Sequence, residues 1–348
     1  MNIFLTGATG FVGKKLTEEL LNDNHHLYVL CRNERKANAF ITGIPLGLRK
    51  NVTCVIGNLS SSLLGLDLKE TENLKGKVEA IFHMAAYLSF DPEQQKESFD
   101  VNLEGTRRAL EFSEKIECRK FLYVSTAYTV GMETAGKEEL YSSERKFVNH
   151  YEESKNHAEH LVHSYKDKME VIILRPSIII GDSRTGEADT TFGVYGLLKA
   201  ASLLKRKVSK KDGWEDNIYR FLGEKELRMN LVPVDYVASV LKEALTLGEN
   251  GKIYNITDPS PLKQKEIFQV VKEVLEFPNL ELVPFSQKDK LSDLENSLNE
   301  ALGIFKHYFT RELYFPCHNT LSLLERAGKN PLKLDHDNLK FILGSYKK

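Results

Sequence analysis

The chain has 348 residues, of which 41% are hydrophobic and 28% are charged, and its formal net charge at pH 7 is −1. These values are typical of a globular protein with one large domain or two unequal ones, and the balanced charge argues against a nucleic-acid-binding protein. The sequence contains no apolar run of the ~18 residues that a membrane-spanning helix needs. Its N-terminus also lacks the basic and apolar regions of a signal peptide.

Short apolar segments alternate with longer amphipathic ones along the first half of the chain. Each apolar segment is a nearly continuous run, which is typical of a strand buried on both faces of a sheet. Because such strands alternate with helices, the pattern predicts an α/β fold with a doubly wound parallel sheet. The predicted strands cover residues 2–6, 26–32, 52–58, 80–86, 120–126 and 171–177, and the predicted helices cover about 11–23, 92–117 and 149–168.

The first predicted strand leads directly into the sequence TGATGFVG, in which Gly7, Gly10 and Gly13 are regularly spaced. A glycine turn between a strand and a helix lets the backbone approach a pyrophosphate, and the helix N-terminus adds a partial positive charge. A phosphate-binding P-loop would need a glycine in place of Ala8 and a hydroxyl residue in place of Lys15. We therefore predict a dinucleotide site; the alternative is a tight turn without a ligand.

The second predicted strand ends with the sequence VLCRNERK. NAD enzymes place an acidic residue at this point for the ribose hydroxyls, whereas NADP enzymes place cations there for the 2′-phosphate. Arg32 occupies this point, and Arg35 and Lys36 follow it, so we predict NADP(H) as the cofactor. The alternative is a solvated loop in which Glu34 offsets one of the charges.

The four cysteines are Cys31, Cys54, Cys118 and Cys317, and none of them are paired at a spacing typical of metal ligands. We therefore expect reduced thiols, no metal site and a cytoplasmic protein.

The segment HYEESKNHAEHL, residues 150–161, places Tyr151 and Lys155 four residues apart in a predicted helix. Residues at this spacing lie on one helix face, one turn apart. Alone, the pair is compatible with an ordinary polar surface helix, because a short motif needs its structural context.

The pattern changes after residue 180. A loop rich in Gly and Thr at 181–193 precedes a basic helix at about 194–207, and a strand, turn and helix follow at 227–245, with one more strand at 252–259. The remaining residues are predicted to be helices and loops. We predict a nucleotide-binding lobe of residues 1–180, to which 227–258 contribute, and a smaller, mostly helical substrate-binding lobe of residues 181–226 and 259–348.

Six motifs together resemble those of the extended short-chain dehydrogenase/reductase family and occur in that family's order. They are TGATGFVG (6–13), HMAA (83–86), NLEGT (102–106), YVSTAYTVG (123–131), YEESK (151–155) and LRPSIIIG (174–181). The resemblance covers the first half of the chain densely, and it implies a Rossmann-type sheet and an oxidoreductase.

In that family Tyr151 and Lys155 would form the catalytic pair. A tyrosine phenol normally has a pKa of about 10, and we expect the Lys155 ammonium and the positive nicotinamide ring to lower it. Lys155 would also bind the nicotinamide ribose. The family pattern, counted back from Gly131, selects Thr126 as the catalytic hydroxyl. Ser125 is the alternative, because successive strand residues point to opposite faces.

Asn102 would belong to a proton relay, although a helix asparagine alone is more often a surface residue. His83 is expected to support the cofactor pocket. The third strand ends with Asn58-Leu59 where the family usually has Asp-Leu near the adenine; because Asn58 still forms hydrogen bonds, we expect binding to survive. The expected cofactor-binding residues are Gly7, Thr9, Gly10, Phe11, Val12, Gly13, Arg32, Arg35, Asn58, Leu59, Ala85, Ala86, Tyr151, Lys155, Pro176, Ser177 and Ile178.

Within the family, the sequences HMAAYLSFD (83–91) and STAY (125–128) resemble the fatty acyl-CoA reductases. The sequence RPSIIIGDSRTGE (175–187) resembles these enzymes and also the reductase domains that release carrier-bound thioesters. The resemblance implies NADPH-dependent reduction of an acyl-CoA or acyl-carrier-protein thioester to an aldehyde or alcohol.

The stretch 199–211 carries six cations and no acidic residue. It would attract the phosphates of coenzyme A or of a phosphopantetheine carrier, or the acidic surface of a carrier protein. A solvated helix, or one at a membrane surface that would make the protein peripheral, is the alternative. The sequence is also compatible with a homodimer.

Two other classes of function are weighed against this one. The first is another enzyme of the same fold, either a reductase of a small ketone, aldehyde or steroid, or a nucleotide-sugar epimerase. A sugar dehydratase normally has an Asp-Glu pair after the catalytic threonine, and Ala127 and Tyr128 stand there. The second is a non-catalytic NADPH sensor, which usually lacks the tyrosine or the lysine of the catalytic pair; this chain has both.

Overall fold

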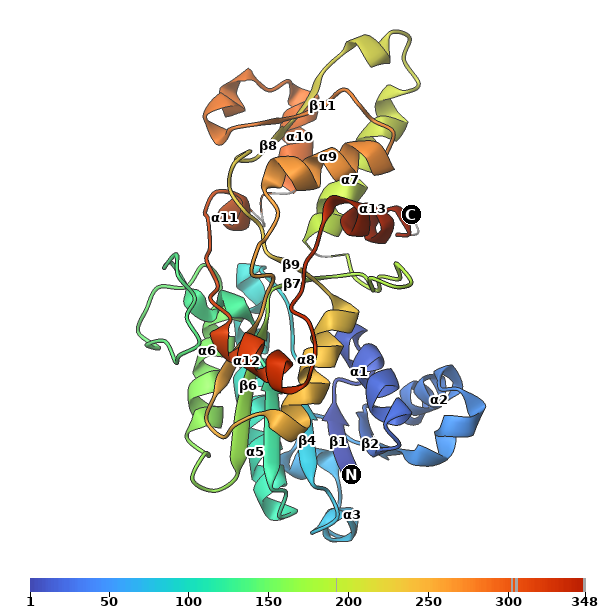
Figure 1. The fold of residues 1–348 in the computed structure, drawn as a ribbon, viewed down its shortest axis with the longest axis vertical. Helices are drawn as coiled ribbons and strands as arrows, with labels where there is room; N and C mark the ends of the chain where they lie inside the picture. The colour runs from blue at the N-terminus through green and yellow to red at the C-terminus, as the bar shows by residue number, and fades with distance from the viewer. Residues whose placement is uncertain (192, 302, 304–305, 347–348) are drawn as a thin grey trace. The chain divides into compact units, whose positions relative to one another are not determined.

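The computed structural model describes residues 1–191, 193–301, 303 and 306–346, and its chain forms two compact units (Figure 1). Unit 1 consists of Met1–Ser177, Asp235–Thr257 and Phe315–Pro331, and unit 2 consists of Ile178–Val234, Asp258–Tyr314 and Leu332–Lys348. None of the helices in the described residues has the length and the apolar character needed to cross a membrane.

Unit 1 contains a seven-stranded parallel sheet with the order β3-β2-β1-β4-β5-β6-β10. The strand order reverses between β1 and β4, and ligands of such sheets bind outside the carboxyl ends of the strands at this point. This topology confirms the predicted fold class. The strands are β1 (Asn2–Thr6), β2 (His26–Cys31), β3 (Val52–Ile56), β4 (Ala80–His83), β5 (Lys120–Val124), β6 (Glu170–Pro176) and β10 (Ile253–Ile256).

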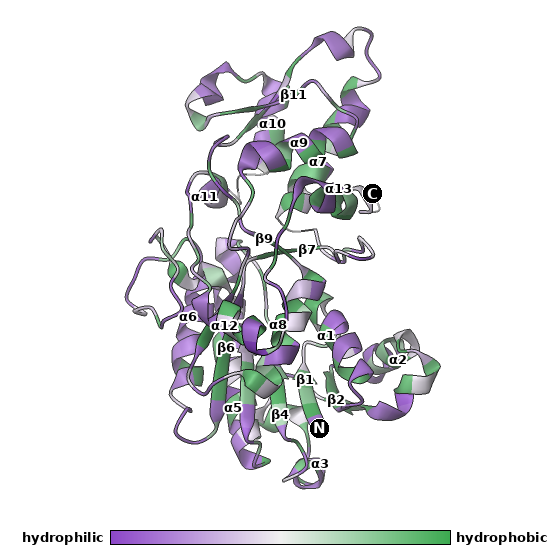
Figure 2. Ribbon diagram, in the orientation of Figure 1, coloured by the Kyte–Doolittle hydropathy of each residue, from purple (hydrophilic) through white to green (hydrophobic). Residues whose placement is uncertain are grey.

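Helices flank this sheet, and hydrophobic residues are concentrated on the strands between them (Figure 2). One part of the core packs Phe4, Ile81, Phe112 and Phe121, all almost fully buried, between the sheet and α5. The longer helices of unit 1 are α1 (Phe11–Asn22), α2 (Glu34–Gly43), α3 (Leu68–Leu74), α4 (Gln95–Phe99), α5 (Gly105–Lys115), α6 (His150–His163), α8 (Val234–Leu247, in unit 1 from Asp235) and α12 (His318–Arg326). Its short helical turns are η1 (Leu46–Asn51), η2 (Ser62–Gly65), η3 (Pro92–Gln94), η4 (Asp100–Glu104) and η5 (Ala127–Val130).

The predicted continuous helix at 92–117 is divided into four parts. After η3 and α4 the chain makes a π-helical turn, η4, before α5 begins. Such π-turns inside helices are frequently found at functional sites. The helices α2 and α3 were missed by the sequence analysis.

Unit 2 contains two small parallel sheets, β7 with β9 and β8 with β11. Its core includes the buried Tyr195, Phe221 and Phe277. Its elements are β7 (Ile178–Ile180), α7 (Val194–Val208), η6 (Trp214–Asp216), β8 (Tyr219–Leu222), β9 (Leu231–Pro233), α9 (Gln264–Val274), β11 (Leu280–Val283), η7 (Phe285–Lys290), α10 (Asp293–Ala301), α11 (Lys306–Phe309) and α13 (His336–Gly344).

Residues 315–331, which the sequence analysis assigned to the second lobe, belong to unit 1. The Glu138 carboxylate accepts hydrogen bonds from the backbone N–H groups of Asn255 at 2.9 Å and Asn319 at 2.7 Å. Through these two hydrogen bonds, Glu138 links α12 to β10. Residues 227–234, expected in the nucleotide-binding lobe, belong to unit 2. The assignment of substrate binding to the second lobe stays a prediction.

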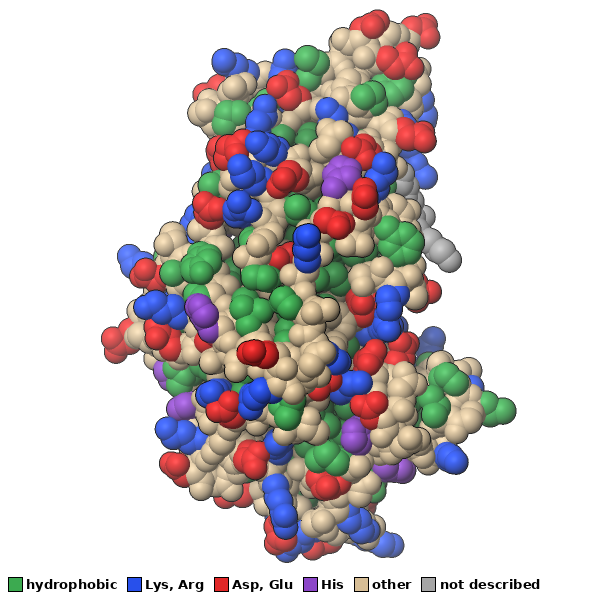
Figure 3. All heavy atoms as spheres, in the orientation of Figure 1, with side chains coloured by type: hydrophobic (Ala, Val, Ile, Leu, Met, Phe, Trp, Pro, Cys, Tyr) green, Lys and Arg blue, Asp and Glu red, His purple; other side chains and the backbone are tan. Residues whose placement is uncertain are grey.

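The face in Figure 3 carries Lys and Arg side chains interspersed with Asp and Glu. This distribution agrees with the formal net charge of −1.

Candidate active site

The glycine turn after β1 is closely packed against the turn that follows β4. Gly7 has a φ of +77°, and a Cβ there would lie 2.6 Å from the backbone N of Ala85. A Cβ on Gly13 would lie 2.2 Å from the carbonyl oxygen of Gly7. Gly10 caps the N-terminus of α1 and is exposed, so backbone rather than side chain faces any ligand there. The two turns follow neighbouring strands at the reversal of strand order, where a dinucleotide pyrophosphate would fit.

We expect the Gly13→Ala variant to bind NADPH at least about tenfold more weakly, because the new methyl group meets backbone atoms and must displace α1. Overpacking of this kind costs about 1–3 kcal/mol of stability. Titration of nicotinamide fluorescence and chemical denaturation measure the two effects. Gly47→Ala is the control, because nothing lies within 4 Å of a Cβ at that position. Wild-type NADPH affinity in Gly13→Ala would contradict the assignment of this turn.

Several of the other expected cofactor residues lie in the segments that follow β1, β4 and β6. Thr9 is exposed, Phe11 and Val12 begin α1, and Ala86 is exposed after β4. Pro176 ends β6, and the Ser177 N–H donates to the Ile256 carbonyl at 3.1 Å; Ile178 begins β7 in unit 2.

Two exposed cations follow β2. In the described part of the chain, neither Arg32 nor Arg35 has a hydrogen bond or an ion pair from its guanidinium group. Asn33 between them caps α2 by accepting a hydrogen bond from the Lys36 N–H at 2.9 Å. Because both arginines are exposed, their guanidinium groups are accessible to a phosphate.

Asn58, which replaces the usual aspartate after β3, stabilises its own turn. Its Oδ1 accepts hydrogen bonds from the Ser60 N–H at 2.9 Å and the Ser61 hydroxyl at 3.2 Å. Leu59 is half-buried, and its carbonyl oxygen accepts from Arg108 at 2.9 Å. The side chain of Asn58 is exposed, so its amide stays accessible near the expected adenine position.

A chain of hydrogen bonds runs from the end of β1 through His83 to η4. The Ala85 N–H donates to the Thr6 hydroxyl at 3.3 Å, and this hydroxyl lies 2.7 Å from Nδ1 of His83. The Thr106 hydroxyl lies 3.0 Å from Nε2 of His83 and donates to the Asn102 carbonyl at 2.6 Å. Because the Thr106 proton is used by that carbonyl, the chain is satisfied when His83 carries its proton on Nε2.

His83 is thereby suited to a supporting role. Burial, followed by the nearby charge of Lys155, lowers the pKa of His83 to about 3. The ring is therefore neutral at physiological pH and links the end of β1 to α5; its support of a cofactor pocket stays a prediction.

Asn102 joins the loop after β4 to α6. Its Oδ1 accepts from the Tyr87 N–H at 2.7 Å, and its Nδ2 donates to the Tyr87 carbonyl at 3.0 Å. The same Nδ2 donates to the Ser154 hydroxyl at 3.0 Å, and Ser154 lies between Tyr151 and Lys155 in α6. Ser154 was missed by the sequence analysis, and its place between the two motif residues was the available signal.

Lys155 lies at the carboxyl end of β5. Lys155 is 1% exposed, and its ammonium group donates to the Val124 carbonyl at 2.7 Å and lies over the Tyr123 ring, 4.4 Å from the ring centroid. Burial lowers the pKa of Lys155 to about 7, and the negative Glu159 acts against this shift. Val124 is the last residue of β5, so the lysine is placed beside the two hydroxyl residues that follow.

Those two hydroxyl residues, Ser125 and Thr126, have different surroundings. The Thr126 hydroxyl caps η5 by accepting from the Tyr128 N–H at 3.3 Å. The Ser125 hydroxyl is buried and has no hydrogen-bond partner among the described residues. Both are at the end of β5, and the choice of Thr126 over Ser125 stays a prediction.

Tyr151 lies in the first turn of α6, which is capped by the Asn149 side chain. Its ring packs edge-on against Phe90 of the loop after β4, with ring centroids 6.2 Å apart. Burial, followed by the negative Glu152, raises the pKa of Tyr151 above its ordinary value. The expected lowering by Lys155 is therefore wrong for this structure, in which the lysine is directed to the Val124 carbonyl. The phenol is protonated at neutral pH.

Known proteins resemble this chain in sequence and in fold. A model of the family described as Male sterility protein (NAD_binding_4) matches residues 5–241. The putative fatty acyl-CoA reductase CG8306 of Drosophila melanogaster is 30% identical over 223 residues, 51% of this chain and 43% of that protein. Fatty acyl-CoA reductase wat of Drosophila melanogaster is 25% identical over 407 residues, 97% of this chain and 76% of that protein. The chain thus spans less than half the length of the first of these relatives and about three quarters of the second.

Two solved structures show the same fold. The terminal R domain from the myxalamid PKS-NRPS biosynthetic pathway has a TM-score of 0.83 and 24% identity, covering 99% of this chain and 90% of that one. Thermus thermophilus UDP-glucose 4-epimerase in complex with NAD has a TM-score of 0.66 and 19% identity, covering 99% and 98%. The family match over residues 5–241 shows that the chain belongs to the Male sterility protein family (NAD_binding_4) of extended short-chain dehydrogenases/reductases.

Proposed function

We propose that the protein is an NADPH-dependent reductase that converts an acyl thioester to an aldehyde or an alcohol. One observation supports this proposal most strongly. The Lys155 ammonium group donates to the carbonyl of Val124, the residue that precedes Ser125 and Thr126, and this contact supports a site shared by the helix of Tyr151 and Lys155 and the end of β5. The thioester substrate is inferred from relatives named fatty acyl-CoA reductase and from the similarity to a terminal R domain.

The residues around the glycine turn fit a dinucleotide. Gly7 and Gly13 leave no room for side chains where the backbone must approach a pyrophosphate, and Arg32 and Arg35 are suited to a 2′-phosphate. Bound NADPH would supply a hydride to the thioester carbonyl carbon.

The catalytic candidates would act on the carbonyl oxygen. Thr126 and Tyr151 would donate hydrogen bonds to it as negative charge develops, which stabilises the transition state more than the ground state. Tyr151 is protonated at neutral pH and so is able to give this oxygen a proton. The resulting hemithioacetal then loses the free thiol and leaves an aldehyde, and a second hydride and proton would give the alcohol. Asn102 would connect Tyr151 to a proton relay through its contact with Ser154.

The basic stretch 199–211 supports a phosphate-bearing substrate carrier. Five of its cations are exposed, on α7 and directly after it, whereas the Lys205 ammonium group donates to the Leu275 carbonyl at 2.8 Å. Coenzyme A or a carrier protein with its phosphopantetheine arm would be attracted to such a surface. Peripheral contact with an anionic membrane is the competing role, and a cytoplasmic location and a homodimer stay predictions.

We expect the double variant Arg32→Ala/Arg35→Ala to raise the KM for NADPH by about tenfold or more, because charged hydrogen bonds of about 1.5–3 kcal/mol each are lost. The KM for NADH should not change, because NADH lacks the 2′-phosphate. Lys69→Ala, an exposed cation of α3, is the control. An equal rise in the KM for NADPH and for NADH would show that these arginines do not bind the 2′-phosphate.

An NADPH-oxidation screen tests the proposed function. Acyl-CoAs of varied chain length and the corresponding carrier-bound thioesters are offered in turn, and the product is identified by mass spectrometry. We expect consumption of NADPH with release of free thiol and aldehyde or alcohol. No turnover with any thioester, together with activity on a small carbonyl compound or a nucleotide sugar, would replace the proposal with the alternative enzyme class.

A further inference from the structure

An ion pair buried inside unit 1 lies next to the catalytic candidates and has no part in the reaction described above. Glu159 of α6 and Arg175 of β6 are both 0% exposed. The guanidinium Nε donates to one carboxylate oxygen at 2.8 Å, and a terminal nitrogen donates to the other at 2.6 Å. Because desolvation of two charges commonly cancels their attraction, a buried pair is weak evidence of a contribution to stability. The pair also holds neighbouring segments in place.

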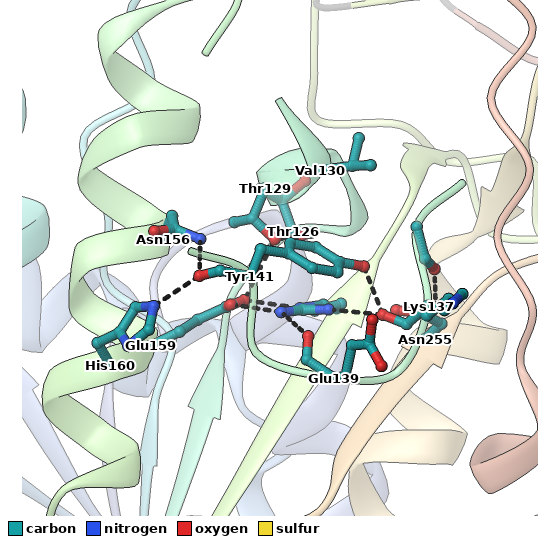
Figure 4. A network of polar contacts seen from close by, with 12 residues as sticks. Thr126, Thr129, Val130, Lys137, Glu139, Tyr141, Asn156, Glu159, His160 and Asn255 are labelled. Carbon is teal, nitrogen blue, oxygen red and sulfur yellow. Dashed lines mark hydrogen bonds and ion pairs between the residues drawn. The ribbon is translucent and has the colours of Figure 1, made fainter. Parts of the chain in front are cut away.

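The arginine side of the pair holds the segment before α6. Arg175 donates to the carbonyl oxygens of Lys137 and Glu139, both at 3.0 Å, and its guanidinium stacks on the Tyr141 ring at 4.3 Å. Figure 4 shows Asn156 and His160 of α6 reaching the Tyr141 carbonyl from the other side. The segment 137–141 is thus fixed between β6 and α6.

The glutamate side of the pair reaches the turn that carries Thr126. One Glu159 carboxylate oxygen lies 3.5 Å from the Thr129 hydroxyl, and this hydroxyl lies 3.2 Å from the Thr126 carbonyl (Figure 4). One carboxylate therefore connects α6, which carries Tyr151 and Lys155, with β6 and with η5.

Glu159 also follows Lys155 by one helical turn, and its negative charge acts on the ammonium group. Among the described residues, Tyr123 of β5 contacts that ammonium group through its ring, and His83 of β4 and Glu159 of α6 interact with its charge. His83 is neutral, and the Tyr123 phenol is protonated because burial raises its pKa. Glu159 is thus the negative charge that favours the protonated lysine.

We propose that Glu159, held by Arg175, is a positioning residue that fixes the three elements of the candidate catalytic site and supplies the counter-charge for Lys155. The proposal rests on the proposed function in taking Lys155 as catalytic. It predicts that loss of the Glu159 charge affects the protonation of Lys155 as well as the fold.

The test measures the pKa of Lys155 without any turnover. In protein labelled with ¹³C at lysine Cε, the Lys155 signal is assigned by its absence in Lys155→Arg and is followed against pH. The wild-type pKa is expected at about 7. In Glu159→Gln it should fall by at least about one unit, which means a tenfold fall in the ratio of ammonium to amine at neutral pH. Glu153→Gln makes the same charge change on α6 at a partly exposed position and should leave the Lys155 pKa unchanged.

Glu159→Gln leaves Arg175 without its carboxylate and risks unfolding, so Glu159→Gln/Arg175→Met provides a second variant without an unpaired buried charge. If the protein turns over thioesters, both variants should lower kcat with little change in the KM for NADPH, and the fall of activity at alkaline pH should begin at lower pH. An unchanged Lys155 pKa in the folded double variant would overturn the proposal. Because the titration needs no substrate, absence of turnover would count against the proposed function alone.

Discussion

Tyr151→Phe is expected to lower kcat for thioester reduction by about a hundredfold to ten-thousandfold, the usual contribution of a positioned acid or base. The substitution removes only the phenol oxygen, so the edge-on contact with Phe90 and the start of α6 should persist. NADPH affinity and the midpoint of thermal unfolding should stay close to the wild-type values. Steady-state kinetics, NADPH titration and thermal denaturation of the same preparation measure the three quantities.

Tyr165→Phe is the matched control for this prediction. Tyr165 lies beyond the end of α6, and its ring contacts the Lys168 ammonium group, at 4.9 Å from the ring centroid. Removal of its hydroxyl should leave kcat unchanged. If Tyr151→Phe and Tyr165→Phe retain equal activity, Tyr151 is not the proton donor.

Arg175→Met is expected to destabilise the protein by about 3–5 kcal/mol, the typical result of removing one partner from a buried ion pair. The Glu159 carboxylate would remain in a fully buried position without its cation, and the carbonyls of Lys137 and Glu139 would each lose the hydrogen bond from Arg175. A urea denaturation curve measures the change in the free energy of unfolding.

The control for this prediction is Arg107→Met in α5. Arg107 pairs with Glu104 at 3.1 Å, and the two side chains are 44% and 41% exposed. Exposed pairs contribute about 0–1 kcal/mol, so this variant should remain near wild-type stability. Equal midpoints for Arg175→Met and Arg107→Met would show that the buried pair does not hold unit 1 together.

Strand positions could be predicted from the sequence because a parallel sheet covered on both faces needs continuous apolar segments. The predicted strands at 2–6 and 26–32 correspond to β1 and β2 within a residue at each end. The helices α2 and α3 were missed because they are short and polar. Their signals lay in their caps, Asn33 for α2 and the reciprocal Asp67–Glu70 pair for α3.

The break in the predicted helix at 92–117 depends on tertiary contacts that local sequence does not contain. The Asn102 side chain in η4 is held by the backbone of Tyr87 and by the Ser154 hydroxyl, 15 and 52 residues away in the chain. The direction of the Tyr151 pKa shift likewise depends on burial in the fold and on Glu152. Helical spacing alone suggested that Lys155 would govern it.

The sequence contains two features that could have predicted the buried ion pair. Arg175 interrupts the apolar run of a strand predicted to be covered on both faces, and a buried guanidinium requires an acidic partner. Glu159 lies at the same helical spacing after Lys155 as Lys155 does after Tyr151. Together these two facts would have suggested the pairing of α6 with β6.

Transfer of deuterium from NADPH to the product tests the central claim most directly. Wild-type protein is mixed with a thioester and NADPH deuterated at the hydride-donating carbon, and the product is analysed by mass spectrometry. The account predicts one deuterium on the former carbonyl carbon of each aldehyde, free thiol in equal amount, and neither product with Tyr151→Phe on the same timescale. Aldehyde without deuterium, or a product that forms equally fast with Tyr151→Phe, would contradict it.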